Sequence, residues 1–274
     1  MRNNAVFVGV LLSFFVATEA LARDLIFTAP PRETKEAGQK LYGPIADHLS
    51  KLLNTKVVYE HPNNWLKYQR DMRNDKYDIV FDGPHFASWR IAHLGHEPLV
   101  KLPGHLQFVL VTDKDNNEIK SSADMIGKSM CGISPPNLST LSMLKLYSNP
   151  ARQPMIKGIK GGMGKVFKTF KAGKCDAAVL RTAFFKKKLK KEQQDSVKKV
   201  VLSNKMPNQV ITVSKRISKE AKFIIQKSLT QGVGVKSTKG ILKRYAGKAK
   251  SFIKAETVEY LPHTALLEGV IFGW

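Results

Sequence analysis

Short runs of apolar residues alternate along the chain with longer stretches in which apolar residues recur at every third or fourth position. The short runs predict buried strands, and the spaced stretches predict helices with one apolar face. The strand-like runs of the first half lie at residues 25–27, 57–59, 78–81 and 108–111. Between the first two, Leu41, Ile45 and Leu49 share one helical face. This order predicts an α/β fold, because parallel strands need helical crossovers that cover the faces of a sheet.

A second series of the same kind follows the polar segment 113–118. Its strands are expected at 130–133, 177–180 and 200–202, and its helices at 138–147, at 166–172 and in a lysine-rich stretch that ends at 191. The helical patterns after residue 218 have no strands of their own and must pack on the first series. We therefore predict two lobes, each a mostly parallel sheet flanked by helices, with the second lobe inserted into the first. The first lobe would comprise residues 23–112 and 206–274, and the second residues 113–205.

The first 22 residues have the pattern of a secretory signal peptide. Arg2 precedes an apolar run over residues 5–17, and Ala20-Leu21-Ala22 offers the small residues that a signal peptidase needs, so cleavage is expected after Ala22. The alternative is an uncleaved anchor, which is disfavoured because the run is short for a membrane span and Glu19 interrupts it. No other apolar stretch approaches that length. We expect an exported, soluble protein.

Composition excludes fibrous and low-complexity classes, because 43% of the 274 residues are apolar. The charge is extreme: 45 Lys and Arg residues against 22 Asp and Glu residues give +23. Such an excess attracts anions, nucleic acid or acidic membrane surfaces. The lysine clusters lack the interleaved aromatic residues that stack on bases, so we expect no specific nucleic-acid partner. Solvated helix faces are the first interpretation, and steering towards anionic ligands or lipid headgroups is the second.

Cys131 and Cys175 are the only two cysteines. Export into an oxidising compartment permits a disulfide between them. Each lies at the start of a short apolar run, and the two runs can be neighbours in one sheet. We predict a Cys131–Cys175 bridge, and the alternative is a pair of buried free thiols.

Loops that follow strand ends are the candidate ligand-binding segments, because ligands bind open α/β sheets outside the carboxyl ends of the strands. Four such loops are expected to face one another across the cleft between the lobes: residues 29–32, 82–86, 134–140 and 181–182. From these loops we select Asn137, Thr182 and the residues discussed below.

Signatures of enzymes, metal sites and cofactor sites are missing from the sequence. The chain has no His-Glu-x-x-His run, no Gly-x-Ser-x-Gly elbow, no P-loop and no Cys-x-x-Cys pair. His93, His96 and His105 are close in sequence, but Gly95 and Pro98 mark the end of their helix, and loop histidines are usually unliganded. We therefore expect no catalytic activity, no metal and no cofactor.

Several short motifs, in order, give the chain a family resemblance. They are Asp78-Ile79-Val80 with Asp82-Gly83-Pro84, then Gly95 and Pro98, then the segment 124–128, then Ala172-Gly173 with Asp176-Ala177. Their order and spacing resemble those of periplasmic solute-binding proteins of the phosphate, phosphite and phosphonate ABC-transport type. The resemblance covers nearly the whole mature chain. It implies a type II periplasmic-binding fold, two lobes closing on a small ligand, and delivery to an inner-membrane permease. We expect a monomer.

The resemblance also implies a site for a small phosphate-like or phosphonate-like anion. Family members hold the anion on a Ser/Thr-rich turn at a helix N-terminus, and Ser139-Thr140 occupy that place. Arg181 stands where amine-phosphonate binders place an acid, and it offers a planar fork suited to carboxylate or phosphate. The turn at 134–141 differs from the usual Ser-Thr-Ser-Gly, and residues 161–163 lack the family's histidine. The identity of the anion therefore stays open.

The remaining candidates have two interpretations each. Trp65 lies where the family places a pocket aromatic, but it can also pack in the core. His85 and Phe86 follow a strand end, which favours a pocket role, although Phe86 can also close the core. Asp82 can bind a polar ligand or cap the following helix. Asn208, at the second crossing between the lobes, can reach the ligand or only form a turn.

Two functions fit the sequence. The first is capture of a small anion for an ABC importer. The alternative is a periplasmic sensing protein that partners a membrane receptor and binds a ligand other than a phosphonate.

Overall fold

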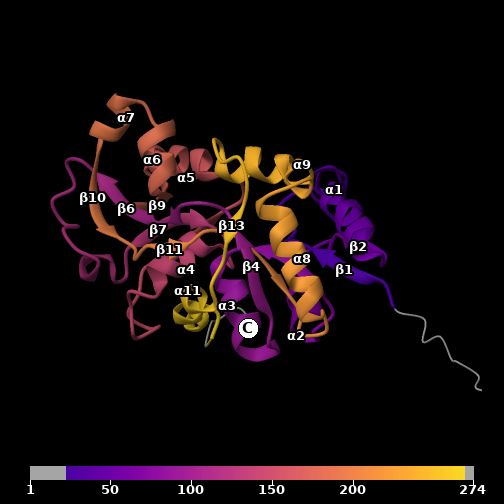
Figure 1. Ribbon diagram of the computed structural model, residues 1–274. Helices are drawn as coiled ribbons and strands as arrows, with labels where there is room; N and C mark the ends of the chain where they lie inside the picture. The colour runs from indigo at the N-terminus through magenta and orange to yellow at the C-terminus, as the bar shows by residue number, and fades with distance from the viewer. Residues whose placement is uncertain (1–22, 269–274) are drawn as a thin grey trace, which may run out of the picture.

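The computed structural model describes residues 23–268, which form an α/β structure built on two sheets (Figure 1). The expected signal peptide at 1–22 lies outside the described residues. The predicted fold class is confirmed. None of the helices in the described part of the chain has the length and apolar character that crossing a bilayer requires.

The first sheet has six strands in the order β13-β4-β12-β3-β1-β2. Their bounds are β1 (Leu25–Thr28), β2 (Val57–Glu60), β3 (Ile79–Asp82), β4 (Glu97–Lys101), β12 (Val210–Val213) and β13 (Ile253–Lys254). β1 runs parallel to β2 and β3, whereas β12 lies antiparallel between β3 and β4. We call this sheet and its helices the first lobe.

Helices cover both faces of the first sheet because its strand residues alternate between two apolar clusters. The helices are α1 (Lys35–Leu53), α2 (Trp65–Arg73), α3 (Pro84–Leu94), α8 (Lys219–Thr230), α9 (Gly234–Ser237), α10 (Lys239–Ile241), η3 (Leu242–Ala246), α11 (Thr257–Tyr260) and η4 (Leu261–Leu266). Phe27, Phe81 and Val213 pack with α1, α8 and α10 on one face. Val80 packs on the other face with α2 and α3. The late helices thus return to the first sheet, as expected.

The second sheet has five strands in the order β10-β6-β9-β7-β8. Its elements are β6 (Phe108–Asp113), β7 (Ser129–Ile133), β8 (Met155–Ile159), β9 (Ala177–Arg181) and β10 (Val197–Leu202), with the helices η1 (Ala123–Met125), α4 (Leu138–Leu144), α5 (Met163–Thr169), η2 (Phe170–Lys174), α6 (Thr182–Lys188) and α7 (Lys191–Asp195). α5, η2 and α6 pack on one face, and α4 packs on the other. We call this sheet and its helices the second lobe.

Two details differ from the sequence prediction. The strand at 108–111 was assigned to the first lobe, but β6 pairs with β9 and β10 in the second sheet, so the expected boundary at 112/113 falls inside this strand. An apolar run does not reveal which sheet a strand joins. The sheets are also mixed rather than mostly parallel. The strands next to the crossings, β6, β10 and β12, need no helical crossover and run antiparallel to their neighbours.

The chain crosses between the lobes twice, and the two crossings pair with each other. β5 (His105–Leu106) and β11 (Met206–Pro207) form a two-stranded antiparallel ribbon. Asn208 braces this region, because its Nδ2 donates to the Pro103 carbonyl at 2.9 Å and its own carbonyl accepts from the Tyr260 hydroxyl at 3.0 Å. An apolar cluster that contains residues of α2, α3 and α4 also joins the lobes.

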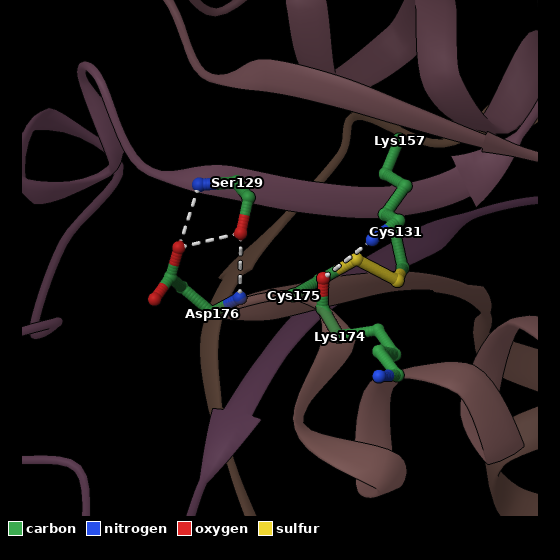
Figure 2. The surroundings of a disulfide bond; sticks show 6 residues. All are labelled: Ser129, Cys131, Lys157, Lys174, Cys175 and Asp176. Atoms are coloured by element: carbon green, nitrogen blue, oxygen red, sulfur yellow. Dashed lines mark hydrogen bonds between the residues drawn. A yellow bond between two sulfur atoms is a disulfide. The ribbon is translucent and has the colours of Figure 1, made fainter.

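A disulfide joins Cys131 in β7 to Cys175, which lies just before β9 (Figure 2). The Cα atoms are 5.7 Å apart, and the predicted bridge is confirmed. Asp176 fastens the same two strands, since its Oδ2 accepts from the Ser129 amide at 2.7 Å and from the Ser129 hydroxyl at 2.6 Å. Asp176 is therefore structural.

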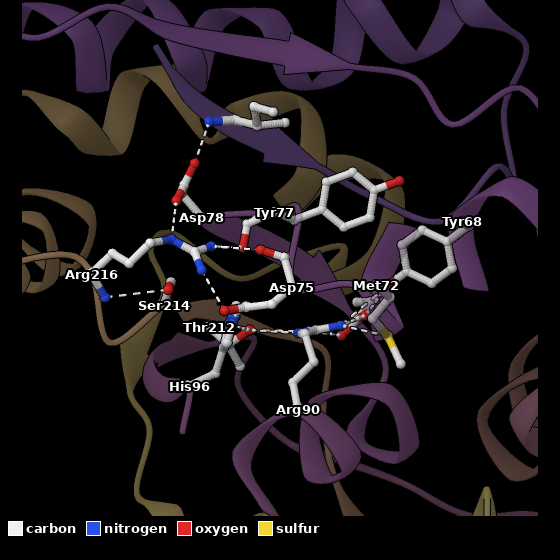
Figure 3. Close-up of polar contacts among 12 residues, drawn as sticks. Tyr68, Met72, Asp75, Tyr77, Asp78, Arg90, His96, Thr212, Ser214 and Arg216 are labelled. Atoms are coloured by element: carbon white, nitrogen blue, oxygen red, sulfur yellow. Dashed lines mark hydrogen bonds and ion pairs between the residues drawn. The ribbon is translucent and has the colours of Figure 1, made fainter. Parts of the chain in front are cut away.

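A buried ion pair ties β3 to α3. Arg90 Nη1 donates to Asp82 Oδ2 at 2.7 Å and Nη2 donates to Oδ1 at 3.0 Å, and both side chains are almost fully buried. Arg90 Nη2 also donates to Thr212 Oγ1 on β12 at 3.0 Å (Figure 3). The Tyr68 hydroxyl on α2 donates to Asp82. The network connects two strands and two helices of the first lobe.

A second ion-paired arginine closes the opposite end of β3. Arg216 Nε donates to Asp78 Oδ1 at 3.0 Å, and Arg216 Nη2 donates to the Asp75 carbonyl at 2.9 Å (Figure 3). The other Asp78 oxygen accepts from the Ile26 amide at 2.9 Å. These contacts fasten β1, β3 and the segment after β12 at one edge of the sheet.

Replacing Arg90 with methionine should lower the free energy of unfolding by about 3–5 kcal/mol, because Asp82 would remain as a buried charge without its partner. Asp82→Asn/Arg90→Met should recover part of that loss, since no buried charge remains. Urea denaturation measures both, and Lys191→Met, which breaks the exposed pair with Asp195, is the control expected to change little. A double variant less stable than Arg90→Met would contradict this account.

Reduction of the disulfide should lower the free energy of unfolding by about 3–4 kcal/mol, because the unfolded chain regains the freedom of a loop closed over a separation of 44 residues. The measurement is urea denaturation with and without reductant. Cys131→Ala/Cys175→Ala should show no effect of the reductant. Two free thiols per chain in denatured, unreduced protein would show that the bridge does not form.

Candidate ligand-binding site at the carboxyl ends of the strands

The turn between β3 and α3 forms the first-lobe side of the candidate site. Gly83 is the N-cap of α3, and Pro84 occupies the first helical turn, where its missing N–H costs nothing. The positive end of the helix dipole therefore points at the loop edge of the sheet. A side chain at Gly83 would come within 2.9 Å of the His85 ring and 3.8 Å of Arg32 Nη2. Glycine lets these two groups flank the turn.

His85 reaches across to the second lobe. Its side chain is 2% exposed, and its Nε2 donates to the Pro136 carbonyl at 3.1 Å, so the proton of the neutral ring lies on Nε2. Nδ1 is buried, faces no protein partner and is left as an acceptor. Burial, and after it the Arg32 charge, lowers the pKa of His85 to about 3. The ring is neutral at ordinary pH.

Arg32, in the loop after β1, is a candidate site residue that the sequence did not single out. Its Nη1 is buried and has no hydrogen-bond partner among residues 23–268. Burial acts to lower the pKa of Arg32. The electrostatic effects of Tyr245, Tyr42 and Asp82 together exceed the effect of burial, so the pKa is raised and the guanidinium stays charged. The strand-end rule selects the loop 29–32, and its one charged residue, Arg32, is the available signal.

Arg181 and Thr182 form the second-lobe side of the site. Arg181 ends β9, and Thr182 follows it with its amide donating to the Gln107 carbonyl at 2.8 Å. Arg181 Nε and Thr182 Oγ1 are both buried, and neither has a hydrogen-bond partner among the described residues. Burial lowers the pKa of Arg181, but the ordinary pKa of arginine is so high that the side chain stays charged. Continuing the β7–β9 register places Arg181 level with Ser134, at the loop that His85 contacts.

Ser139 and Thr140 lie close by, but their hydroxyl protons are already used. Ser139 Oγ donates to Asn137 Oδ1 at 2.7 Å, and the Ser139 amide donates to the same oxygen at 3.0 Å. Thr140 Oγ1 donates to the Ile133 carbonyl at 2.6 Å. Thr140 Oγ1 also faces Gly132, where a Cβ atom would come within 2.5 Å of it. Asn137 thus serves as the N-cap of α4, and these three residues shape the loop.

The other sequence candidates lie in or beside the packed interior. Trp65 is half-buried and stacks on the fully buried Phe86, with ring centroids 5.9 Å apart. Both oxygens of Asp82 are bound by Arg90. Asn208 is engaged by the crossing segments. The structure thus places Arg32 and His85 at the loop edge of the first sheet, and Arg181 and Thr182 at the loop edge of the second.

Other features of the described residues do not compete for this role. Between residues 23 and 268 no group of three or more His, Cys, Asp or Glu side chains is placed to hold a metal ion. An open cavity of about 320 Å³ lies beside the disulfide, lined among others by Asp113, Lys171 and Asp176. It opens at the amino ends of β7 and β9, away from the edge where ligands of such sheets bind.

Comparison with known proteins adds a family and a fold. The family model described as "ABC transporter, phosphonate, periplasmic substrate-binding protein" matches residues 27–260. No curated protein matches the sequence. Among solved structures, PhnD1 from Prochlorococcus marinus in complex with methylphosphonate has a TM-score of 0.63 at 18% identity, covering 89% of this chain and 96% of that one. XAC2383 from Xanthomonas citri bound to ATP has a TM-score of 0.68 at 12% identity, with the same coverage. PA3383 from Pseudomonas aeruginosa, a binding protein component of an ABC phosphonate transporter, has a TM-score of 0.59 at 15% identity, covering 89% and 85%. At these identities the structures show a shared fold.

The buried His85 should make the protein less stable in acid. Its folded pKa of about 3 lies below the value of 6.5 for a free histidine, so protonation favours the unfolded chain. The contribution to stability is complete above about pH 6.5 and is lost as the pH falls towards 3. Near pH 5 the chain should take up about one proton at this site on unfolding, and His85→Gln should remove that uptake. Urea denaturation across this range measures the slope, with exposed His105→Gln as the control. An unchanged slope in His85→Gln would refute the assignment.

Proposed function

The chain belongs to the periplasmic substrate-binding proteins of phosphonate ABC transporters, and from that premise we propose that it captures a small phosphorus oxyanion between its two lobes. Proteins of this family bind small ligands and work with a membrane permease. The proposed ligand contacts are Arg32 and His85 from the first lobe and Arg181 and Thr182 from the second.

One observation carries the proposal. Four buried side-chain atoms at the carboxyl ends of β1, β3 and β9 have no hydrogen-bond partner in the described part of the chain: Arg32 Nη1, His85 Nδ1, Arg181 Nε and Thr182 Oγ1. A buried polar group left without a partner costs about 1–3 kcal/mol, so such groups point to a missing partner. Arg32 Nη1, Arg181 Nε and Thr182 Oγ1 can each donate a hydrogen bond, and the two arginine side chains carry positive charge. An oxyanion supplies the acceptors that this set requires.

His85 Nδ1, the fourth atom, narrows the class of ligand further. Because Nε2 of His85 donates to the Pro136 carbonyl, Nδ1 accepts, and its matching partner is an O–H or N–H on the ligand. A phosphonate or phosphate that keeps one proton presents both oxyanion acceptors and a hydroxyl donor. Sulfate at neutral pH has no hydroxyl. The site should therefore prefer the phosphorus oxyanions.

The arrangement of the two lobes supports capture by closure. The four groups come from both sheets, and the paired crossings at β5 and β11 provide a short connection about which the lobes can rotate. A ligand that contacts both lobes stabilises the closed form by its contacts on each side. PhnD1 holds methylphosphonate and XAC2383 holds ATP, and both ligands carry tetrahedral phosphorus oxyanions.

Titration calorimetry with phosphate, phosphite, methylphosphonate, ATP and sulfate tests the proposal. At least one phosphorus oxyanion should bind, and sulfate should bind much more weakly. Arg32→Gln and Arg181→Gln should each weaken binding about ten- to a hundredfold, because a charged hydrogen bond contributes about 1.5–3 kcal/mol.

Lys187→Ala, on the exposed surface of α6, is the matched control and should leave the affinity unchanged. Absence of binding by every oxyanion, or equal affinity in wild type and both arginine variants, would overturn the proposal. Equal affinity for sulfate and methylphosphonate would overturn the assignment of His85.

A further inference from the structure

The helices on the outer face of the second sheet carry a dense positive charge. From residue 155 to residue 191 the sequence contains a single acidic residue, Asp176. The exposed lysines of this region and of the adjoining β10 form a surface that we call the basic layer: Lys157, Lys160, Lys165, Lys168, Lys171, Lys174, Lys186, Lys187, Lys188, Lys190, Lys191 and Lys199.

The basic layer faces away from the first lobe. α5 and α6 pack through Phe167 and Phe185 on the side of the second sheet that carries Val109 and Leu180. The opposite side of the sheet packs with α4 and joins the apolar cluster shared with the first lobe. In Figure 1, α5, α6 and α7 accordingly lie together at one end of the molecule, remote from α1 and α8. Within α6, Lys186, Lys187 and Lys188 occupy the last turn, at the opposite end of the helix from Thr182 of the candidate site.

Little of this charge is neutralised within the protein. Lys171 pairs with Asp113 at 2.6 Å and Lys191 pairs with Asp195 at 2.7 Å. Lys186, Lys187 and Lys188 form no ion pair with any residue in the described part of the chain. Like charges held this close on one face repel each other, so an external anionic surface that faces them is attracted strongly.

We propose that the basic layer docks the protein onto the surface of a bilayer that contains anionic phospholipid. The layer is a face of short helices whose aromatic residues point inward: Phe185 is 4% exposed and lies under Lys199. It offers no aromatic platform on which bases stack, which disfavours single-stranded nucleic acid. None of the large exposed apolar side chains of the described residues belongs to α5, α6 or α7, so these three helices offer no such side chain to the acyl chains. Contact is electrostatic and lies at the headgroups.

This orientation also suits a protein that works beside a membrane. Each lysine near an anionic membrane surface contributes about 1 kcal/mol, and the attraction decays within about 10 Å at moderate salt. Docking through the outer face of the second lobe leaves the crossing segments and the ligand site clear of the bilayer. The inference does not depend on which ligand the site holds.

Co-sedimentation with lipid vesicles tests the proposal. Vesicles of phosphatidylcholine with phosphatidylglycerol should bind the protein at low salt, and pure phosphatidylcholine vesicles should not. Raising the salt to about 0.5 M should release the protein, because the contact is screened. Lys186→Glu/Lys187→Glu/Lys188→Glu should weaken vesicle binding by about a hundredfold or more.

The matched control is Lys219→Glu/Lys227→Glu/Lys236→Glu, which changes the net charge equally on exposed positions of the first lobe. It should weaken vesicle binding much less, and circular dichroism should show both variants folded. Equal loss in the two variants, binding to neutral vesicles, or absence of binding to anionic vesicles would overturn the proposal. So would tighter binding of an oligonucleotide than of anionic vesicles at the same salt. Ligand affinity should be the same in both variants, so failure of vesicle docking is separate from failure of the proposed function.

Discussion

The buried ion pair between Asp82 and Arg90 determines where α3 begins and how it leaves β3. Asp82 is the last residue of the strand, and Arg90 lies two turns into the helix, so the bidentate contact fixes the intervening Gly83–Pro84 turn. Tyr68 and Thr212 complete the network, which matters because a charge in this interior is tolerated only when its hydrogen bonds are made. The position of His85 follows from this turn.

The candidate site differs from that network because some of its buried polar atoms make no hydrogen bond within the described part of the chain. Around Asp82 the buried polar groups bind one another, whereas Arg32, His85, Arg181 and Thr182 each present a buried atom without a partner. Both sets lie at the ends of strands, and the Asp82–Arg90 network fixes the turn that carries His85. A rigid turn beside unsatisfied donors is the arrangement expected of a site that waits for a ligand. The basic layer is independent of it, because it lies on the far side of the second sheet.

Sequence patterns predicted the fold well because strands such as 57–59 are apolar runs and the helix with Leu41, Ile45 and Leu49 has a clear apolar face. The disulfide was predictable because two cysteines allow only one pairing. The sheet to which β6 belongs could not be predicted, because strand pairing is a long-range contact. The strand-end rule selects the loops that carry His85, Arg181 and Thr182, and it equally selects Ser139 and Thr140, whose hydroxyls bind their own loop. Arg90 has a buried acidic partner, whereas Arg32 Nη1 has no partner among the described residues. This difference depends on tertiary packing, which the sequence pattern does not reveal.

We propose that one phosphorus oxyanion bridges the two lobes at Arg32, His85, Arg181 and Thr182. A crystal structure of the protein grown with methylphosphonate is the sharpest test of this bridge. We expect phosphonate oxygens within about 3.2 Å of Arg32 Nη1, Arg181 Nε and Thr182 Oγ1, with His85 Nδ1 facing a ligand hydroxyl. A phosphonate bound elsewhere, or these atoms satisfied by protein groups or water while the ligand is bound, would contradict it.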